Sequence, residues 1–399
     1  MSPSVLVFCA SPLVGSPISQ RIAVLGAELA ARGWSVQLLA VDPAFTGDAW
    51  TSTDPISGMP VEVVGPTHYR LHDGRRVTTP PLRHLQECRA ITRALRTRID
   101  AARPDHVVLS TTLPASLHAA AVLGRRLPSL WLDSDDWTAG QFTANGGSPL
   151  VGRVYGALER SLPRRARMTV CSEELLRTFP AAALVPNFLR LDDVPRRPAP
   201  AGSGAAKARV VFAGSVTGFY GHDALVDALA RRRDDLDGLV VRILGDGPAL
   251  GACREQVRGA GLDGVVTFGG QLDRPAMLEE LVRADISVAP LRDVAVDRAR
   301  FPLKLLDGLA AGCAVVASEV GTAADLLVDG ESALLSPAGD ADAMVKDLLR
   351  LADDRDLLAR LAGAGQAVVA PYDAGLVCAR WAELLTSGAD ASVPGPAPT

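Results

Sequence analysis

The chain has 399 residues, a length that favours two domains over a single core. Its hydrophobic content of 48% excludes wholesale disorder, and its formal net charge of −4 gives no basic footprint of the kind that binds nucleic acid. The six cysteines form no Cys-x-x-Cys pair, which favours reduced, buried thiols in the cytoplasm over a disulfide or zinc framework. The apolar run at residues 5–10 is too short for a signal peptide or a membrane span.

Apolar runs and helical patterns alternate from the N-terminus onward. Residues 5–8 and 36–39 have the pattern of short buried strands, and residues 20–32 repeat apolar side chains at helical spacing up to Gly33. Strand, helix and strand in this order predict a parallel βαβ unit. The loop after the first strand lacks Gly-x-Gly-x-x-Gly, so the sequence offers no dinucleotide-binding fingerprint.

The rest of the first half extends this alternation. Further strands are predicted at residues 61–64, 106–110, 129–132 and 168–171. Two helical patterns, at residues 82–102 and 153–167, are basic; the first contains Arg83, Arg89, Arg93, Arg96 and Arg98. Such a basic face can contact anionic lipid or an acidic partner, and the alternative is a solvated face balanced by acidic neighbours.

Three carboxylates follow the strand predicted at residues 129–132, namely Asp133, Asp135 and Asp136. They are not expected to be core residues together, because each unpaired buried charge is costly. The carboxyl end of a strand in an open parallel sheet is where ligands bind, so these residues are candidates for ligand contacts. Two alternatives remain open: metal binding, and a turn cap formed by one of the three.

A Pro/Gly/Ala-rich stretch at residues 195–207 is the clearest domain boundary in the sequence. Five strand patterns separated by helical patterns follow, at residues 210–213, 239–244, 265–268, 286–289 and 314–317. This alternation predicts a second doubly wound parallel sheet. The loop from Gly214 to His222 precedes a predicted helix, and its small residues would let a phosphate approach backbone amides at the helix start.

Residues 298–340 carry the most informative pattern. Pro302 suits the first turn of a short helix, and Gly312 suits its left-handed end. Lys304 and Asp307 are three residues apart, so they share one helix face near a terminus that attracts anions. We interpret this arrangement as a binding site for a nucleoside diphosphate, with Lys304 on phosphate and Asp307 on ribose hydroxyls. The alternative is an ordinary surface ion pair between the two side chains.

The order and spacing of this stretch resemble the donor-site segment of retaining GT-B glycosyltransferases of family four, the glycosyl transferases group 1. The positions that carry the resemblance are Pro302, Lys304, Asp307, Ala310, Gly312, Val315, Val316, Ala317, Ser318, Gly321, Asp329, Gly330 and Leu334. Three positions depart from the family pattern. Asp307 stands where a ribose-binding glutamate is usual, Ala299 where a second glutamate is usual, and Ala314 where a proline is usual.

The resemblance implies a set of site residues. Those assigned to the donor are Gly214, Ser215, Tyr220, Gly245, Pro290, Arg300, Phe301, Pro302, Leu303, Lys304, Leu305 and Asp307. Those assigned to catalysis are Asp135, Asp136 and Lys304, and those assigned to an N-terminal cleft loop are Gly15 and Ser16, for which a plain turn is the alternative. Ser215 and Tyr220 stand where the family has an arginine and a lysine, so Lys304 must neutralise more of the diphosphate.

The resemblance also implies a fold. It would be α/β, with two Rossmann-like doubly wound parallel-sheet domains facing a central cleft. An acceptor domain would span residues 1–190, a linker residues 191–207, and a nucleotide-sugar donor domain residues 208–370. A helix at residues 371–386 would cross back to the first domain, and residues 387–399 would form a disordered tail.

The activity implied is transfer of a sugar from a nucleotide-sugar to an acceptor hydroxyl or amine, with retention of the anomeric configuration. No cofactor, metal or nucleic-acid partner is expected. The acceptor would be a small molecule, a glycan or a lipid-linked molecule, met in the cytoplasm or through peripheral contact at the inner face of the membrane. The alternatives are a nucleotide-sugar epimerase of the same fold and a non-catalytic protein that binds a nucleotide-sugar beside an active transferase.

Overall fold

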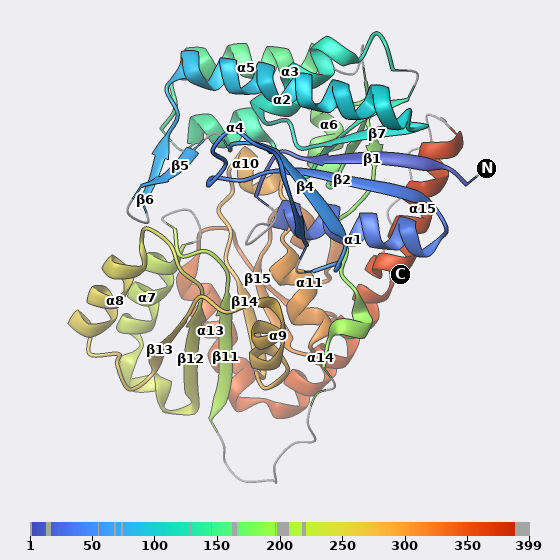
Figure 1. Cartoon of the computed structure of the whole chain (residues 1–399). Coiled ribbons are helices and arrows are strands. Elements are labelled where there is room, and N and C mark those ends of the chain that lie inside the picture. The colour runs from blue at the N-terminus through green and yellow to red at the C-terminus, as the bar shows by residue number, and fades with distance from the viewer. Residues whose placement is uncertain are drawn as a thin grey trace. The chain divides into compact units, whose positions relative to one another are not determined.

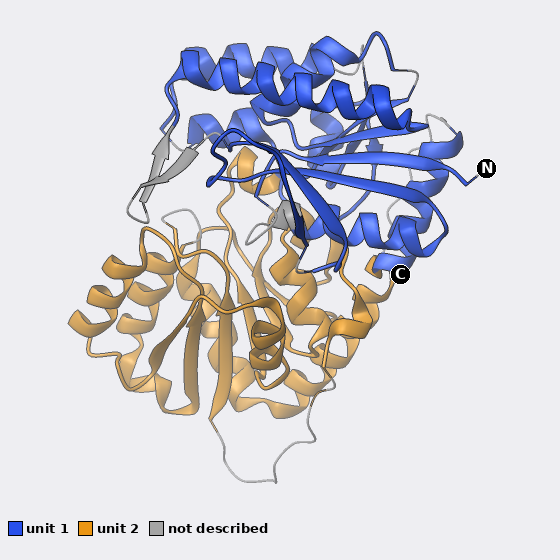
Figure 2. Ribbon diagram, in the orientation of Figure 1, with its two compact units in different colours: residues 1–187, 299–301, 374–397 blue, residues 188–298, 302–373, 398–399 orange. Residues whose placement is uncertain are grey.

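The computed structural model describes residues 2–12, 17–54, 56–67, 69–72, 75–127, 129–144, 146–161, 166–195, 197, 207–217 and 221–387. The chain divides into two compact units (Figure 2). Unit 1 comprises residues 1–187, 299–301 and 374–397, and unit 2 comprises residues 188–298, 302–373 and 398–399. Two short pieces of the C-terminal half therefore belong to the unit that the N-terminal half builds.

Unit 1 contains an eight-stranded sheet in the order β10-β9-β8-β7-β1-β2-β4-β3 (Figure 1). Its strands are β1 (Ser4–Cys9), β2 (Ser35–Val41), β3 (Trp50–Thr53), β4 (Pro60–Gly65), β7 (His106–Ser110), β8 (Leu130–Ser134), β9 (Arg167–Val170) and β10 (Ala183–Leu184). Neighbouring strands are parallel except for the edge pair β3 and β4. A separate antiparallel pair is formed by β5 (Tyr69–His72) and β6 (Arg75–Thr78).

Strand β1 lies between β7 and β2, so the sheet of unit 1 has its topological switch point beside β1. Ligands of doubly wound sheets bind at such a point, outside the carboxyl ends of the strands. The helices of this unit are α1 (Pro17–Ala31), α2 (Pro81–Ala102), α3 (Pro114–Leu123), α4 (Thr138–Ala144), α5 (Pro149–Ser161), α6 (Glu173–Thr178) and α15 (Ala374–Ser387). Helices α1 and α15 pack together although they come from opposite ends of the chain.

Unit 2 contains a six-stranded, wholly parallel sheet in the order β13-β12-β11-β14-β15-β16. Its strands are β11 (Ala208–Ala213), β12 (Leu239–Leu244), β13 (Val266–Gly270), β14 (Ile286–Ala289), β15 (Ala314–Ser318) and β16 (Leu334–Ser336). Its α-helices are α7 (His222–Arg231), α8 (Leu250–Gly259), α9 (Arg274–Val282), α10 (Ala295–Arg298), α11 (Leu303–Ala310), α12 (Thr322–Leu326), α13 (Ala341–Asp353) and α14 (Arg355–Val369). The strands are largely apolar because helices cover both faces of the sheet, and β14 and β15 are buried along their whole length.

The two parallel sheets confirm the predicted α/β class. Strand β8 differs from its prediction, since it continues past Leu132 to Ser134 and therefore includes Asp133. A carboxylate can lie inside this strand because a buried arginine neutralises it, as described below. The prediction that the three carboxylates near residue 133 lie beyond the strand is therefore wrong for Asp133.

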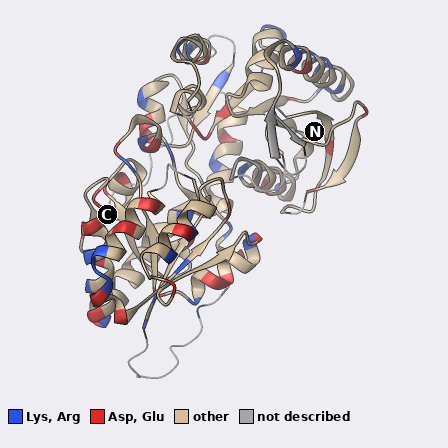
Figure 3. Ribbon diagram, turned by 90° about the vertical axis from the view of Figure 1, so that its left-hand side faces the viewer, with Lys and Arg blue, Asp and Glu red and all other residues tan. Residues whose placement is uncertain are grey.

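Charges of both signs are interspersed along the helices of both units (Figure 3). All six cysteines are free and buried, as the sequence predicts. Among the helices in the described ranges, none is both long enough and apolar enough to cross a membrane.

Candidate functional site

Two loops at the carboxyl edge of the unit 2 sheet are held against each other by backbone hydrogen bonds. The amide of Gly214 donates to the carbonyl of Leu244 at 2.9 Å, and the amide of Val216 donates to that of Asp246 at 3.0 Å. A Cβ atom on Gly245 would lie 1.9 Å from the carbonyl oxygen of Gly214, and the backbone of Gly245 has φ 137°. Only glycine permits this approach, so Gly245 has a steric role, and its contact with the donor stays a prediction.

Two helices of unit 2 begin beside these loops without a side-chain cap. Helix α7 follows Gly221, whose φ is 65°, and helix α11 follows Pro302; neither N-cap residue provides a side-chain hydrogen bond. Pro302 therefore precedes the helix, one residue earlier than the predicted first-turn position. The first amides of an uncapped helix and its dipole form a site that attracts anions.

Lys304, in the first turn of α11, lies close to both the first loop and α7. Its Cδ is 3.8 Å from the point where a Cβ on Gly214 would be, and its Nζ is 4.8 Å from the centroid of the Phe212 ring. His222 is the first residue of α7, and the centroid of its ring is 4.0 Å from the centroid of the Phe212 ring. Burial, and then the charge of Lys304, lower the pKa of His222 to about 4. The imidazole is therefore neutral at pH 7, and Lys304 supplies the positive charge here.

Asp307 lies one turn further along α11 and is paired with an arginine that the sequence analysis did not select. Arg274, the first residue of α9, donates to the two carboxylate oxygens of Asp307 at 2.9 Å and 3.5 Å. The side chain of Asp307 is 5% exposed, so the predicted alternative of a surface ion pair is wrong for this residue. Burial raises the pKa of Asp307, and the charge and hydrogen bonds of Arg274 oppose that rise.

The other residues predicted for the donor in unit 2 have different environments. Pro290 packs at the start of α7, with its Cβ 3.8 Å from where a Cβ on Gly221 would be. Ser215 is exposed, Leu303 is half-buried and Leu305 belongs to the core. Tyr220 lies outside the described residues, as do Gly15 and Ser16 of the predicted N-terminal loop.

Arg300 and Phe301, also predicted for the donor, belong to unit 1. The segment 299–301 is held there by side chains: the amide nitrogen of Asn187 donates to the carbonyl of Phe301 at 2.8 Å, and the hydroxyl of Ser172 donates to that of Ala299 at 2.7 Å. The Nε atom of Arg300 is 3.9 Å from a carboxylate oxygen of Asp136. The structure therefore brings together one residue predicted for the donor and one predicted for the acceptor.

The carboxylates at the end of β8 have three distinct environments. Asp133 is buried and accepts two hydrogen bonds from Arg21 of α1, at 2.9 Å and 3.0 Å. Asp135 is 7% exposed, and its Oδ1 has no hydrogen-bond partner among the described residues. Burial, and then the negative charges of Asp136 and Asp133, raise the pKa of Asp135 well above its ordinary value. Asp133 therefore stabilises the fold, and Asp135 and Asp136 remain the candidates for ligand contact.

Neither unit presents a metal site among the residues that the structure describes. No group of three or more histidine, cysteine, aspartate or glutamate side chains converges in those ranges. The carboxylates near β8 are instead engaged with arginines from α1 and from the 299–301 segment.

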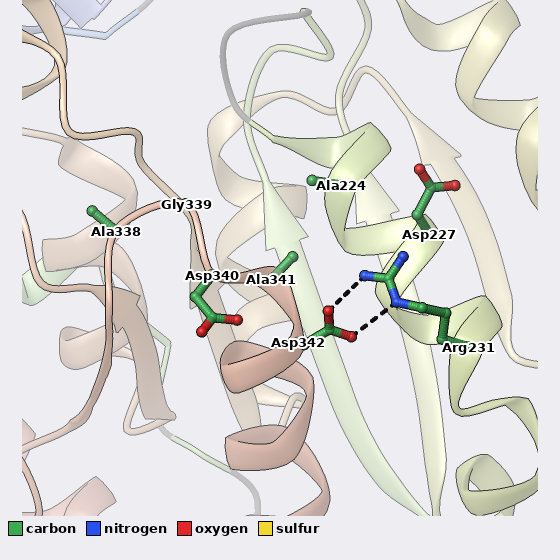
Figure 4. Close-up of a pocket in the computed structure, with 8 residues that line it drawn as sticks. All are labelled: Ala224, Asp227, Arg231, Ala338, Gly339, Asp340, Ala341 and Asp342. Carbon is green, nitrogen blue, oxygen red and sulfur yellow. Dashed lines mark hydrogen bonds and ion pairs between the residues drawn. The ribbon is translucent and has the colours of Figure 1, made fainter.

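A separate open hollow of about 470 Å³ lies on unit 2 between α7 and the loop before α13 (Figure 4). Its lining residues are Ala224, Asp227, Arg231, Ala338, Gly339, Asp340, Ala341 and Asp342. An ion pair between Arg231 and Asp342 crosses it, with contacts of 3.1 Å and 2.8 Å. Because Arg231 and Asp342 already satisfy each other and the hollow includes no residue predicted for the site, we do not assign it to a ligand.

Comparison with known proteins gives matches to both units. The family described as Glycosyl transferases group 1 matches residues 207–354, and that described as Glycosyl transferase 4-like domain matches residues 18–187. An exopolysaccharide phosphotransferase of Streptomyces coelicolor is 30% identical over 285 residues, 71% of this chain and 29% of that protein. A phosphatidyl-myo-inositol mannosyltransferase of Mycobacterium leprae is 30% identical over 251 residues, 61% of this chain and 62% of that protein. The chain thus spans less than two thirds of either relative.

Solved structures with the same fold match almost the whole chain. Sucrose-phosphate synthase from Thermosynechococcus elongatus has a TM-score of 0.75 at 18% identity, covering 97% of this chain and 99% of that one. Anabaena HepE, solved in complex with UDP and glucose, has a TM-score of 0.72 at 16% identity, covering 96% of this chain and 100% of that one. At such identities the likeness concerns the fold.

Proposed function

The chain belongs to the glycosyl transferases group 1 family, and on that basis we propose that it transfers a sugar from a nucleotide-sugar donor to an acceptor hydroxyl or amine with retention of the anomeric configuration. Its fold is that of the GT-B glycosyltransferases, with two Rossmann-like parallel-sheet units. The group 1 match falls on the segment that carries Lys304 and Asp307, and the 4-like match falls on the segment that carries Asp135 and Asp136. This division supports a donor site in unit 2 and an acceptor site in unit 1.

The observation that carries the proposal is that Lys304 lies beside the N-termini of two helices, α7 and α11, neither of which has a side-chain cap. The donor diphosphate would lie against the first amides of α7 and α11, beside Gly214, with Lys304 neutralising part of its charge. Gly214 has φ 145°, and its missing side chain leaves the backbone open to a phosphate. His222 would contribute no charge there, because its pKa is about 4.

The ribose of the donor would lie on Asp307. A carboxylate offers about four acceptor positions, and Arg274 occupies two of them. The remaining positions would accept hydrogen bonds from the ribose hydroxyls while Arg274 holds the carboxylate in place. Arg274 thereby compensates for the shorter side chain that Asp307 presents where the family has a glutamate.

The acceptor would be positioned in unit 1 by Asp135 and Asp136, near the carboxyl end of β8. Burial and its acidic neighbours raise the pKa of Asp135, which favours the protonated form of this side chain. Asp136, which lies near Arg300, would orient the nucleophilic hydroxyl or amine. The acceptor classes proposed are a small molecule, a glycan or a lipid-linked molecule met at the cytoplasmic side of a membrane.

Retention would follow from attack on the same face that the leaving group departs from, with the donor phosphate accepting the acceptor's proton. No side chain need form a covalent intermediate in this scheme. The residues of the chain would act by orienting the two substrates and by stabilising the charge that develops on the departing diphosphate. Lys304 and the amides at the starts of α7 and α11 are the groups in unit 2 suited to that second task.

The proposal predicts that a nucleoside diphosphate stabilises the protein against thermal unfolding. Ligand at about 100 times its dissociation constant should add roughly 2.7 kcal/mol to the free energy of unfolding. The measurement is a shift in Tm across UDP, GDP, ADP, CDP and TDP for the wild type, Lys304→Ala and Leu303→Ala. Lys304→Ala should lose affinity by about 1.5–3 kcal/mol, because it removes a charge-assisted contact, and Leu303→Ala should not. A flat Tm across all five ligands would contradict nucleotide binding altogether.

A donor-hydrolysis assay separates the proposed transferase from a protein that only binds the donor. A transferase slowly passes its sugar to water when no acceptor is present, whereas a binding protein leaves the donor intact. Nucleotide binding without any hydrolysis or transfer would favour the non-catalytic alternative.

A further inference from the structure

Helix α5 of unit 1 exposes a stripe of large apolar side chains to solvent. Leu150, Val154 and Leu158 recur every four residues and are 69%, 56% and 54% exposed, and Val151 beside them is 51% exposed. On a water-facing helix these positions are ordinarily polar. Contiguous exposed apolar side chains on a folded protein mark a surface that contacts something else.

The opposite side of α5 is fixed to the body of unit 1, so the helix cannot rotate to bury its stripe. The hydroxyl of Tyr155 donates to the carbonyl of Thr112 at 2.6 Å. The carboxylate of Glu159 is fully buried and accepts hydrogen bonds from the hydroxyl of Thr112 at 2.6 Å and from the amide of Ala139 at 3.2 Å. The outward direction of Leu150, Val154 and Leu158 is therefore a fixed property of the fold.

The exposed charged side chains of α5 are both positive. They are Arg153 and Arg160, both exposed, while the helix's single acid, Glu159, is buried on the inner side. The whole chain, by contrast, has a formal net charge of −4. The exposed surface of α5 therefore carries positive charge, in contrast to the negative net charge of the whole chain.

Helix α2 also carries exposed apolar and basic side chains. It packs against α3, and its Cys88 is close enough to Tyr155 of α5 to add to the rise in the pKa of that tyrosine, after burial and Glu159. Leu82, at the start of α2, is 81% exposed and Leu85 is 41% exposed. One and two turns beyond Leu85, Arg89 and Arg93 are exposed, and neither forms an ion pair with the described part of the chain.

We propose that this α5–α2 face, formed by the exposed apolar and arginine side chains of α5 and of the first four turns of α2, binds the surface of a bilayer containing anionic phospholipid. The leucines and valines would enter the boundary between headgroups and acyl chains, and the arginines would contact lipid phosphates. The charge of the face favours an anionic bilayer over a second copy of the chain, because two copies of this face would bring only positive charge into one interface. The proposal is independent of the sugar transfer proposed above.

The test is co-sedimentation of the whole chain with vesicles of phosphatidylcholine alone or with about one third phosphatidylglycerol. The wild type should bind the anionic vesicles at least about tenfold more tightly, and raised salt should weaken the binding. The triple change Leu150→Ser, Val154→Ser and Leu158→Ser should abolish binding, and the pair Arg153→Gln and Arg160→Gln should weaken the preference for anionic lipid. Leu376→Ser with Arg380→Gln, an exposed pair on α15, is the matched control and should bind as the wild type does.

A fluorescent label reports directly on which surface meets the lipid. Because the six native cysteines are buried, a thiol introduced by Val154→Cys can be labelled selectively with a solvent-sensitive dye, and Leu376→Cys serves as its control. The dye at residue 154 should shift to the blue on addition of anionic vesicles, and the dye at residue 376 should not.

Three results would overturn the proposal. They are equal binding to both kinds of vesicle, binding that the α5 changes leave intact in variants with wild-type Tm, and a wild-type dimer that the triple change dissociates. The last result would assign the face to a second copy of the chain. Lys304→Ala should sediment with vesicles as the wild type does, and the triple α5 variant should bind nucleotide as the wild type does, so failure of one proposal leaves the other testable.

Discussion

Asp135 and Asp307 are both buried carboxylates, but their hydrogen-bonding or charged neighbours act on their pKa values in opposite directions. Asp307 accepts two hydrogen bonds from Arg274, which favour its ionised form against the cost of burial. Asp135 lies beside Asp133 and Asp136, and burial together with these like charges favours its protonated form. Burial raises the pKa of both carboxyl groups; at Asp307 the hydrogen-bonded arginine opposes that rise, whereas at Asp135 two like charges add to it.

At this scale the first prediction concerns Arg274. Replacing it with glutamine removes the charge that opposes the raised pKa of Asp307, so the pKa should rise further and the carboxylate should be protonated as the pH falls. Nucleotide affinity, compared at pH 8 and pH 6, should then fall more at the lower pH for Arg274→Gln than for the wild type. Titration calorimetry with the preferred nucleoside diphosphate measures both.

Arg283→Gln is the matched control for this experiment, because Arg283 follows the same helix and its ion pair with Glu279 is exposed. It should leave the affinity and its pH dependence unchanged. An Arg274→Gln variant whose affinity matches the wild type at both pH values would show that Asp307 does not depend on this arginine to bind ribose.

The second prediction at the residue scale concerns Asp135 and Asp136. Asparagine at either position should leave nucleotide affinity within about twofold, because separate sites are nearly independent. Transfer should fall at least tenfold, about 1.4 kcal/mol, because a group that positions the acceptor acts on the reacting complex. Turnover should persist in EDTA. Loss of turnover in EDTA and its return with manganese would instead make these aspartates metal ligands.

At the scale of single elements, helix α5 carries a buried carboxyl group, that of Glu159, on its inner side. Burial raises the pKa of Glu159 from 4.5 to about 7, and its hydrogen bonds from Thr112 and Ala139 oppose that rise. The folded state therefore holds a proton that the unfolded state releases between these two values. Stability from this group is complete below pH 4.5 and is lost as the pH rises through 7.

Glu159→Gln should remove this dependence. The free energy of unfolding of the wild type relative to the variant should fall by about 3 kcal/mol between pH 4.5 and pH 8, since each pKa unit corresponds to about 1.4 kcal/mol. Urea unfolding at several pH values measures it, with Glu173→Gln, an exposed acid on α6, as the control. Parallel curves for the wild type and Glu159→Gln would mean that Glu159 is ionised throughout this range.

Elements that are buried on both faces could be predicted from the sequence. Strand β14, which is buried along its whole length, matches its predicted bounds, and so does β12, whose run is apolar except for Arg242. The sequence does not predict the edge strand β3, whose four residues are all exposed and carry no such run. The length of β8 could not be predicted from the sequence either, because the inclusion of Asp133 in the strand depends on Arg21, which is distant in the sequence.

At the scale of the whole molecule, contacts between segments far apart in the chain could not be predicted from the sequence. Arg21 donates to Asp133, to the carbonyls of Val185 and Pro186, and to the side chain of Asn187, over separations of 112 to 166 residues. An arginine within an apolar helix carries no signal that names these partners. The same limit applies to Arg274, which meets Asp307 33 residues later, and to the 299–301 segment held by Ser172 and Asn187.

The last helix of the chain returns to the unit in which the chain begins, and Trp381 fixes it there. Its side chain is fully buried, and the guanidinium of Arg21 lies 4.8 Å from its ring centroid. Trp381→Ala should therefore cost about 3–5 kcal/mol of stability, because it leaves a large cavity and removes a cation–π contact from a buried arginine. Leu376→Ala, at a position 52% exposed on the same helix, should change stability by less than about 0.5 kcal/mol.

Chemical denaturation measures the stability of both variants. The nucleotide affinity of Trp381→Ala should stay within about twofold of that of the wild type, because the donor residues on α11 lie in the other unit. Equal losses in the two variants would mean that α15 is held by its whole length and that neither the ring nor Arg21 is its anchor.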